Sequence, residues 1–234
     1  MPPSELNAPV LPPLSRLTLE WSARTDLVPG DPEDGLINWG FTASVAADPE
    51  WDDMGWLEVP GATLEPAKPA YGHLLEAVVF RMSGFTLDLD RGPDPAAALD
   101  RDADAWEFAV LFDTDGELVG PFGNTQRLVV VDRVQLASAW RGARVGSLLT
   151  VRSLRELIRE DDLIGVYPHP FELDEREEPV TPDALASVQR FWAAIGFVPV
   201  TSAPRLFTMG PGSGEIDLVL TLLEADLLGD GASD

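Results

Sequence analysis

Segment 127–160 constrains the fold most strongly, because it reads as a strand, a short loop rich in glycine and arginine, and a helix. Four consecutive apolar residues, followed by alternating Val134 and Leu136, predict a strand over Arg127–Ala137. The spacing of apolar residues predicts a helix over Arg141–Glu160, and the next apolar run predicts a strand over Leu163–Tyr167. A strand, helix and strand in this order indicate a β-α-β unit in a mixed α/β sheet.

The residues before this unit are rich in predicted strands. Acidic turn-forming stretches separate them, and a helix over Pro95–Phe112 is expected to follow, with Asp94 as its N-cap. The expected strands are Leu17–Trp21, Leu36–Val45, Trp56–Val59 and Leu74–Met82.

After the unit, a second helix is predicted from Pro182, capped by Thr181 and stopped at Gly196. The last expected strands are Phe197–Val200, Arg205–Met209 and Ile216–Leu222. The sequence therefore predicts one α/β (mixed-sheet α+β) domain over residues 15–224, between a flexible arm at 1–14 and a flexible tail at 225–234.

Composition excludes several classes of site. The chain has no cysteine, which rules out disulfides and thiolate-ligated zinc, and it has two histidines, His73 and His169. The acidic run at 100–104 begins like a calcium loop, but Ala105 stands where that loop needs glycine, so no metal site is expected. The start lacks the pattern of a signal peptide and no apolar run could span a bilayer, so we expect a cytoplasmic protein with no membrane partner.

The charge of the chain is unevenly distributed. The whole chain carries a formal net charge of −24, which argues against nucleic-acid binding. Residues 127–160, however, hold 7 basic and 3 acidic side chains. An anionic ligand is expected there, although a solvated arginine-rich helix would give the same count.

The position of two of these arginines favours the ligand. Arg141 and Arg144 stand at the predicted start of the helix, where the helix dipole already favours anions and opposes cations. Gly142 and Gly146 would let a ligand approach the backbone closely. A pyrophosphate would explain this arrangement, whereas Arg155 and Arg159 lie near the helix end, where cations are favourable without any ligand.

Two motifs resemble the GNAT superfamily of N-acetyltransferases. The family's acyl-CoA signature is Gln/Arg-x-x-Gly-x-Gly/Ala, and Arg141-Gly142-Ala143-Arg144-Val145-Gly146 matches its first arginine and its last glycine but has arginine at the inner glycine position. Phe191-Trp192-Ala193-Ala194-Ile195-Gly196-Phe197 looks like the family's Leu-Tyr-x-x-x-Gly-Phe. The resemblance covers about residues 120–200.

The resemblance implies an acyl-CoA N-acyltransferase-like fold and acetyl-CoA as the acyl-donor substrate. The pantetheine arm would lie where the strand before the loop splays from Leu163–Tyr167, and the Leu136 N–H would serve as oxyanion donor to the thioester. An amine would attack the thioester directly. The residues implied in binding the coenzyme are Leu136, Ala137, Arg141, Gly142, Ala143, Arg144, Val145, Gly146, Ser147 and Trp192.

Trp192 stands where the family often has a tyrosine that protonates the leaving thiolate. Indole cannot donate this proton, so Tyr167 and His169 are the candidate catalytic residues, with the alternatives of a half-buried strand residue and an ordinary loop residue. No carboxylate is fixed as the base; Asp132 and Glu172 are nearest in sequence to the expected cleft, and water could serve instead.

The expected acceptor is a primary amine on a small molecule or peptide. The acidic loop at 172–178 could attract a cationic amine or could serve only solubility. We expect a monomer or a homodimer. Two alternatives remain: a catalytically impaired GNAT-like acyl-CoA-binding or regulatory module, and an unrelated α/β protein.

Overall fold

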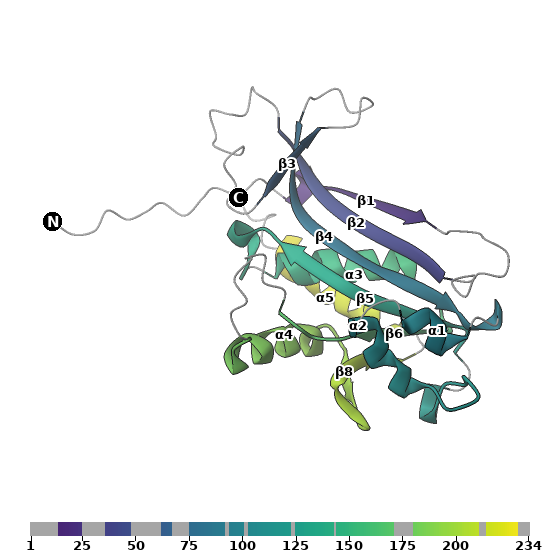
Figure 1. Ribbon diagram of the computed structural model, residues 1–234. Coiled ribbons are helices and arrows are strands. Elements are labelled where there is room, and N and C mark those ends of the chain that lie inside the picture. Colours follow the sequence, from purple (N-terminus) through teal and green to yellow (C-terminus); the bar gives the residue numbers. More distant parts are fainter. Residues whose placement is uncertain are drawn as a thin grey trace.

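In the computed structural model, the described strands form one mixed sheet with helices on both faces (Figure 1). The structure describes residues 14–24, 36–47, 62–66, 75–91, 94–100, 103–122, 125–142, 144–170, 180–210 and 214–228. The strands are β1 (Thr18–Arg24), β2 (Leu36–Ala47), β3 (Thr63–Pro66), β4 (Leu75–Asp88), β5 (Arg127–Leu136), β6 (Asp162–Val166), β7 (Val198–Val200) and β8 (Ala203–Met209).

The strands follow the order β1-β2-β4-β5-β6-β8-β7, and β3 adds to β4 beside it. Within the described part of the chain, β5 and β6 form the one parallel pair, and all other neighbours are antiparallel. The mixed α/β sheet predicted from the sequence is confirmed. The β-rich N-terminal half joins the β-α-β unit in the same sheet through pairing of β4 with β5.

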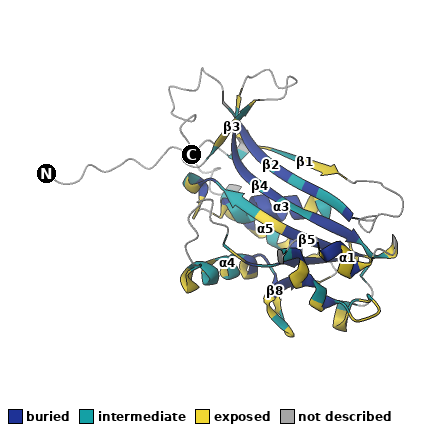
Figure 2. Cartoon of the chain, in the orientation of Figure 1, coloured by how far each residue is buried: buried dark blue, intermediate teal, exposed yellow. Residues whose placement is uncertain are grey.

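Two hydrophobic clusters fill the space between the sheet and its helices. The helices are α1 (Pro95–Leu99), α2 (Ala103–Trp106), α3 (Val145–Leu157), α4 (Pro182–Ala194) and α5 (Gly214–Leu228). One cluster packs α3, α5 and the end of α4 against β2, β4 and β5. The other packs α1, α2 and the 3-10 turn Glu107–Leu111 against the opposite face. Figure 2 shows buried residues concentrated along the central strands.

The expected helix over Pro95–Phe112 is wrong as one element. Asp94 does cap a helix, because its side chain accepts a hydrogen bond from the Ala96 N–H, but that helix ends at Leu99. Helix α2 and the 3-10 turn Glu107–Leu111 then follow as separate short pieces. Phe108 and Leu111 lie in the 3-10 turn, and both are buried in the second hydrophobic cluster although no continuous helix carries them.

The expected strand over Ile216–Leu222 is also wrong, since these residues belong to α5. Buried Ile216 and Leu223 lie seven residues apart on one helical face, with Glu215 and Asp217 in the first turn, where acidic side chains favour a helix. Residues 225–228 of the expected tail continue this helix. The expected strand Trp56–Val59, residues 1–13 of the arm and residues 229–234 lie outside the described residues.

Helix α3 begins later than the predicted Arg141 and ends before Glu160. The backbone before it cannot be helical, because Gly142 has φ 89° and Arg144 has φ 56°. The described helices are all too short or too polar to traverse a bilayer.

Candidate functional site

The two parallel strands of the β-α-β unit separate halfway along β5. Pairing runs from Arg127↔Asp162 to Val131↔Val166, whereas β5 itself continues to Leu136. At the paired end, a two-bond ion pair joins the strands: Arg127 Nε and Nη2 donate to Asp162 Oδ1 and Oδ2 at 2.8 and 2.5 Å. The strands are therefore closed at one end and open at the other.

Asp132 marks the point at which the strands separate. β4 advances from Gly84 to Ser83 while β5 advances from Val131 to Arg133, so Asp132 is the extra residue of a β-bulge. An extra residue reverses which face the following side chains occupy. As a result Val134 and Leu136 lie on the same face as Val131 and pack against the α3 side of the sheet.

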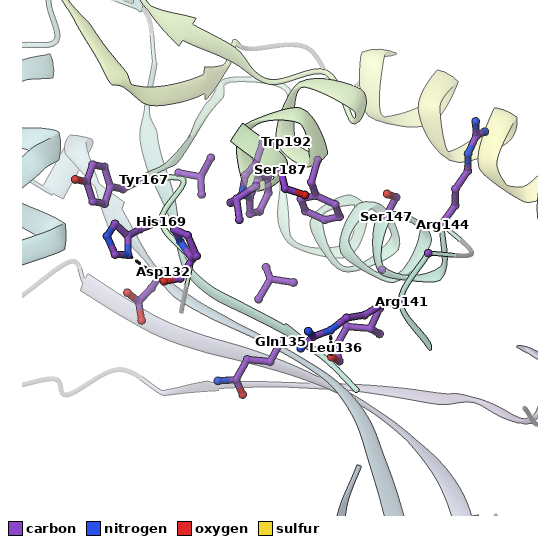
Figure 3. Close-up of a pocket in the computed structure, with 17 residues that line it drawn as sticks. Asp132, Gln135, Leu136, Arg141, Arg144, Ser147, Tyr167, His169, Ser187 and Trp192 are labelled. Carbon is purple, nitrogen blue, oxygen red and sulfur yellow. Dashed lines mark hydrogen bonds between the residues drawn. The ribbon is translucent and has the colours of Figure 1, made fainter. Parts of the chain in front are cut away.

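A cavity of about 590 Å³ occupies the opening. Its wall comes from β5, the loop before α3, the first turn of α3, the end of β6 and one face of α4 (Figure 3). The lining residues are Asp132, Val134, Gln135, Leu136, Arg141, Gly142, Arg144, Gly146, Ser147, Val166, Tyr167, His169, Pro170, Ser187, Val188, Phe191 and Trp192.

The backbone of Leu136 is directed into the opening. The Ala137 N–H donates to the Val79 carbonyl at 2.8 Å, which makes this pair of residues hydrogen-bonded across β4 and β5. Hydrogen-bonded and non-hydrogen-bonded pairs alternate in an antiparallel ladder, so the neighbouring pair Phe80↔Leu136 is non-hydrogen-bonded. The N–H and C=O of Leu136 therefore point away from β4, towards the side where pairing with β6 has ended.

Arginine and glycine form one end of the cavity. Arg141 Nε donates to the Leu136 carbonyl at 3.1 Å, which holds the guanidinium beside the end of β5. Gly142 is in the left-handed region that favours glycine. A Cβ on Gly146 would stand 3.1 Å from Leu136 Cδ2, so glycine here keeps the helix start close to the strand.

Arg144 lines the cavity, but its guanidinium turns towards α5 (Figure 3). Its Nη1 lies 3.0 Å from Asp226 Oδ2, and both side chains are well exposed. The residue is the N-cap of α3, makes no side-chain capping bond and has a left-handed backbone. Its charge at the helix start is thus opposed by Asp226, where the sequence alone suggested an unsatisfied cation.

Two further arginines of α3 make the same kind of contact. Arg152 pairs with Glu224 at 2.8 Å and Arg155 with Asp217 at 2.5 Å, both on α5. For Arg155, the ion pair with α5 adds a specific partner to the favourable helix-end position. These pairs explain part of the basic excess in 127–160 without a ligand.

The middle of the cavity is apolar. Val134 and Val166 come from the two strands, and Val188 and Phe191 come from α4. Trp192 lies behind them, buried, with its ring edge-on to Phe191 and Phe197 at centroid distances of 5.1 and 5.0 Å. Its role in the structure is to build the wall.

Titratable side chains gather where the strands divide. Tyr167 directly follows β6, and its ring stacks on His169 at 6.0 Å with an interplanar angle of 12°. Figure 3 shows His169 between Tyr167 and Asp132, with the Tyr167 hydroxyl pointing away from Leu136. Imidazole and carboxylate groups in this arrangement can accept and pass on a proton at the wall of the cavity.

The structure brings most of the sequence-predicted site residues to this one cavity. Two are not on its wall: Ala137 is buried with its N–H already bonded, and Val145 is buried in the core. Ala143 and Glu172 lie outside the described residues. The residues brought to the wall are Leu136, Arg141, Gly142, Arg144, Gly146, Ser147, Tyr167, His169 and Trp192.

Of the α4 wall, the sequence indicated Trp192 as a site residue but not Ser187, Val188 or Phe191, and it gave no sign of the acidic partners on α5. Ser187 and Val188 precede Phe191 by four and three residues, which places all three on one helical face and could have indicated them. The sequence did not indicate Asp217, Glu224 and Asp226 because the apolar pattern at 216–222 predicts a strand, whereas these residues lie on α5.

Comparison with known proteins gives little support for an assignment. No protein-family model matches the chain. No curated protein matches it either. Among solved structures, a chain described as "The crystal structure of KacTA-DNA complex" aligns with 88% of this chain and 98% of its own length, at 11% identity and a TM-score of 0.39. A likeness of this size establishes neither a shared fold nor a function.

Proposed function

We propose that the chain is an acyl-CoA-dependent N-acyltransferase that transfers acetyl from acetyl-CoA to a primary amine. The observation that carries the proposal is the cavity between the separating ends of β5 and β6, together with the Leu136 N–H directed into it. The motif at 141–146 that resembles the GNAT signature forms one end of this cavity. The GNAT-like fold itself is part of the proposal.

The cavity suits a long ligand with an anionic end and an apolar middle. The pyrophosphate of the coenzyme would lie at Arg141 and Gly142, near the first turn of α3. Its pantetheine arm would pass along Val134 and Val188, beside the backbone that Leu136 presents. The thioester would then approach the end where Asp132 and His169 lie.

The left-handed backbone at Arg144 supports the resemblance. The family usually has glycine at this position, and φ 56° is a conformation that glycine adopts readily. Arg144 therefore departs from the motif in its side chain only, because its backbone has a conformation that glycine adopts readily.

The reaction needs no covalent enzyme intermediate. The amine lone pair attacks the thioester carbonyl carbon, a C–N bond forms, and the carbonyl electron pair moves onto oxygen, which accepts a hydrogen bond from the Leu136 N–H. Collapse of this intermediate breaks the C–S bond and the thiolate leaves with its electron pair. His169 takes the proton from the attacking amine, directly or through water, and returns it to the thiolate.

Asp132 gives the acceptor end of the cavity a negative charge. Its carboxylate favours approach of an amine that enters as an ammonium ion, on a small molecule or a peptide. The ammonium ion releases one proton to water before its lone pair attacks, and the proton that His169 carries to the thiolate is the second one. The net charge of −24 acts in the same direction over longer distances.

A binding experiment tests the proposed pocket. Acetyl-CoA should raise the melting temperature with the logarithm of its concentration above the dissociation constant, and the stabilisation should reach about 2.7 kcal/mol at one hundred times that constant. Arg141→Glu should abolish most of this rise, and Arg190→Glu should not, because Arg190 is exposed on α4 and does not line the cavity. An equal rise in both variants contradicts the assigned pocket.

A thiol-release assay tests turnover. The chain has no cysteine, so a thiol reagent reports coenzyme A without background from the protein. Amine-dependent release with a panel of primary amines supports the transferase. Saturable binding with no release across the panel supports the impaired binding module instead. This module is the alternative because Trp192 stands where the family often has a proton-donating tyrosine. No stabilisation at saturating acetyl-CoA rejects both.

A further inference from the structure

The cavity has a carboxylate-bearing helix attached to its cationic end. Of the described residues that line it, Arg141 and Arg144 carry the guanidinium groups. Arg141 donates a hydrogen bond to the Leu136 carbonyl, and because a carbonyl is neutral this contact does not neutralise the arginine charge. Arg144 instead faces Asp226 of α5 at 3.0 Å, so half of the arginine charge at this end is opposed by an internal anion.

The three ion pairs between α3 and α5 differ in what they touch. Arg152–Glu224 and Arg155–Asp217 lie along the shared length of the two helices, and neither arginine lines the cavity. With buried Ile216 and Leu223, these two pairs hold α5 against α3. Arg144–Asp226 adds a third contact at the cavity itself.

The Arg144–Asp226 pair is easily exchanged. Its side chains are 67% and 54% exposed, and exposed single ion pairs contribute little to stability. Arginine binds phosphate oxygens through two parallel hydrogen bonds, and a pyrophosphate carries more than one negative charge. Such a ligand is the stronger partner for the guanidinium once it enters the cavity.

We propose that Asp226 regulates the anion affinity of the cavity by competing with the phosphate-bearing end of the ligand for Arg144. The inference rests on the proposed function in that it takes the ligand to carry a pyrophosphate. When the ligand binds, Arg144 turns from Asp226 to the phosphate, and the C-terminal end of α5 loses one of its contacts with α3. The C-terminal helix thus responds to occupancy of the cavity.

Isothermal titration with inorganic pyrophosphate and with acetyl-CoA tests this competition. Asp226→Asn should tighten binding of both ligands by about two- to fivefold at low salt, the range expected from removal of one exposed ion-pair partner. Glu224→Gln is the matched control, because it removes one negative charge from the same helix and from a pair that lies off the cavity. Its affinities should equal those of the wild type.

Salt separates competition from a structural effect. The gain in Asp226→Asn should shrink as ionic strength rises, because the exposed pair that it removes is screened. A gain that persists unchanged at high salt, or that Glu224→Gln shows equally, overturns the proposal.

The two ligands distinguish failure of this inference from failure of the proposed function. Equal acetyl-CoA affinity in the wild type and in Asp226→Asn overturns the competition and leaves the transferase proposal standing. Tighter pyrophosphate binding in Asp226→Asn with no acetyl-CoA binding supports the competition and rejects the transferase. If neither ligand binds to any of the proteins, both proposals are overturned.

Discussion

Arg127 and Asp162 form a buried ion pair that fastens together the ends of β5 and β6 opposite the cavity. Asp162 Oδ2 also accepts a hydrogen bond from the Arg159 backbone N–H at 2.7 Å, so the same carboxylate holds the loop between α3 and β6. The separation of the strands begins four residues beyond this pair, after Val131 and Val166. The ion pair therefore closes the end of the strand pair that lies opposite the cavity.

Asp162→Ala should lower the free energy of unfolding by about 3–5 kcal/mol, because it leaves the Arg127 charge buried without its partner. Denaturant unfolding measures the change. Asp161→Ala is the control, since the neighbouring side chain is exposed and should change stability little. Equal stability of the two variants would show that the pair does not fasten the strands.

Gly146→Val should weaken acetyl-CoA binding about tenfold or more, because its side chain would crowd Leu136 and Phe191 at the wall. Gly214→Val is the comparison, as a Cβ on Gly214 meets nothing within 4 Å. Calorimetric titration of both variants measures the affinities. Unchanged binding in Gly146→Val would place the ligand elsewhere.

Arg144→Gly should be more stable than Arg144→Ala by about 1 kcal/mol, because both variants lose the pair with Asp226 and glycine alone accepts φ 56° without strain. Thermal and denaturant unfolding of the two variants give the difference directly. If alanine is as stable as glycine, the left-handed backbone carries no strain.

His169→Gln should lower kcat by about 100-fold if its imidazole carries the proton, with little change in the KM for acetyl-CoA. Tyr167→Phe keeps the ring that stacks on His169 and removes a hydroxyl that points away from Leu136, so it should change kcat far less. Steady-state kinetics of thiol release separates the two. The reverse order of effects would assign the proton transfer to Tyr167.

Local signals in the sequence were sufficient for much of the fold. The apolar runs located β5 and β6, and Thr181, Pro182 and Gly196 bounded α4 closely, since Thr181 caps it and Gly196 has φ 103°. Capping and strand alternation depend on residues a few positions apart, so they can be predicted from the sequence alone.

Features that depend on contacts between distant segments were not predictable. The apolar run at 216–222 fits a strand or a helix equally well, and packing against α3 decides for the helix. The direction of Arg144 depends on Asp226, 82 residues away. The GNAT-like motifs indicated the arginine and glycine end of the cavity and Trp192 on α4, whereas Ser187 and Val188 were found only from the structure.

Asp132 is the extra residue of a bulge that lies directly after the last β5–β6 pair, so the opening begins where the number of residues in β5 exceeds that in β4. Any side chain at this position preserves the spacing, so substitutions there should leave the architecture intact. Removal of that residue would make β5 regular against β4: Val134 and Leu136 would keep Met82 and Phe80 as their partners and stay on the α3 side of the sheet, and the bend and extra twist that a bulge gives to β5 would be lost. We therefore expect the course of β5 beyond Val131, where its pairing with β6 ends, to depend on the number of residues at the bulge more than on the side chain at position 132.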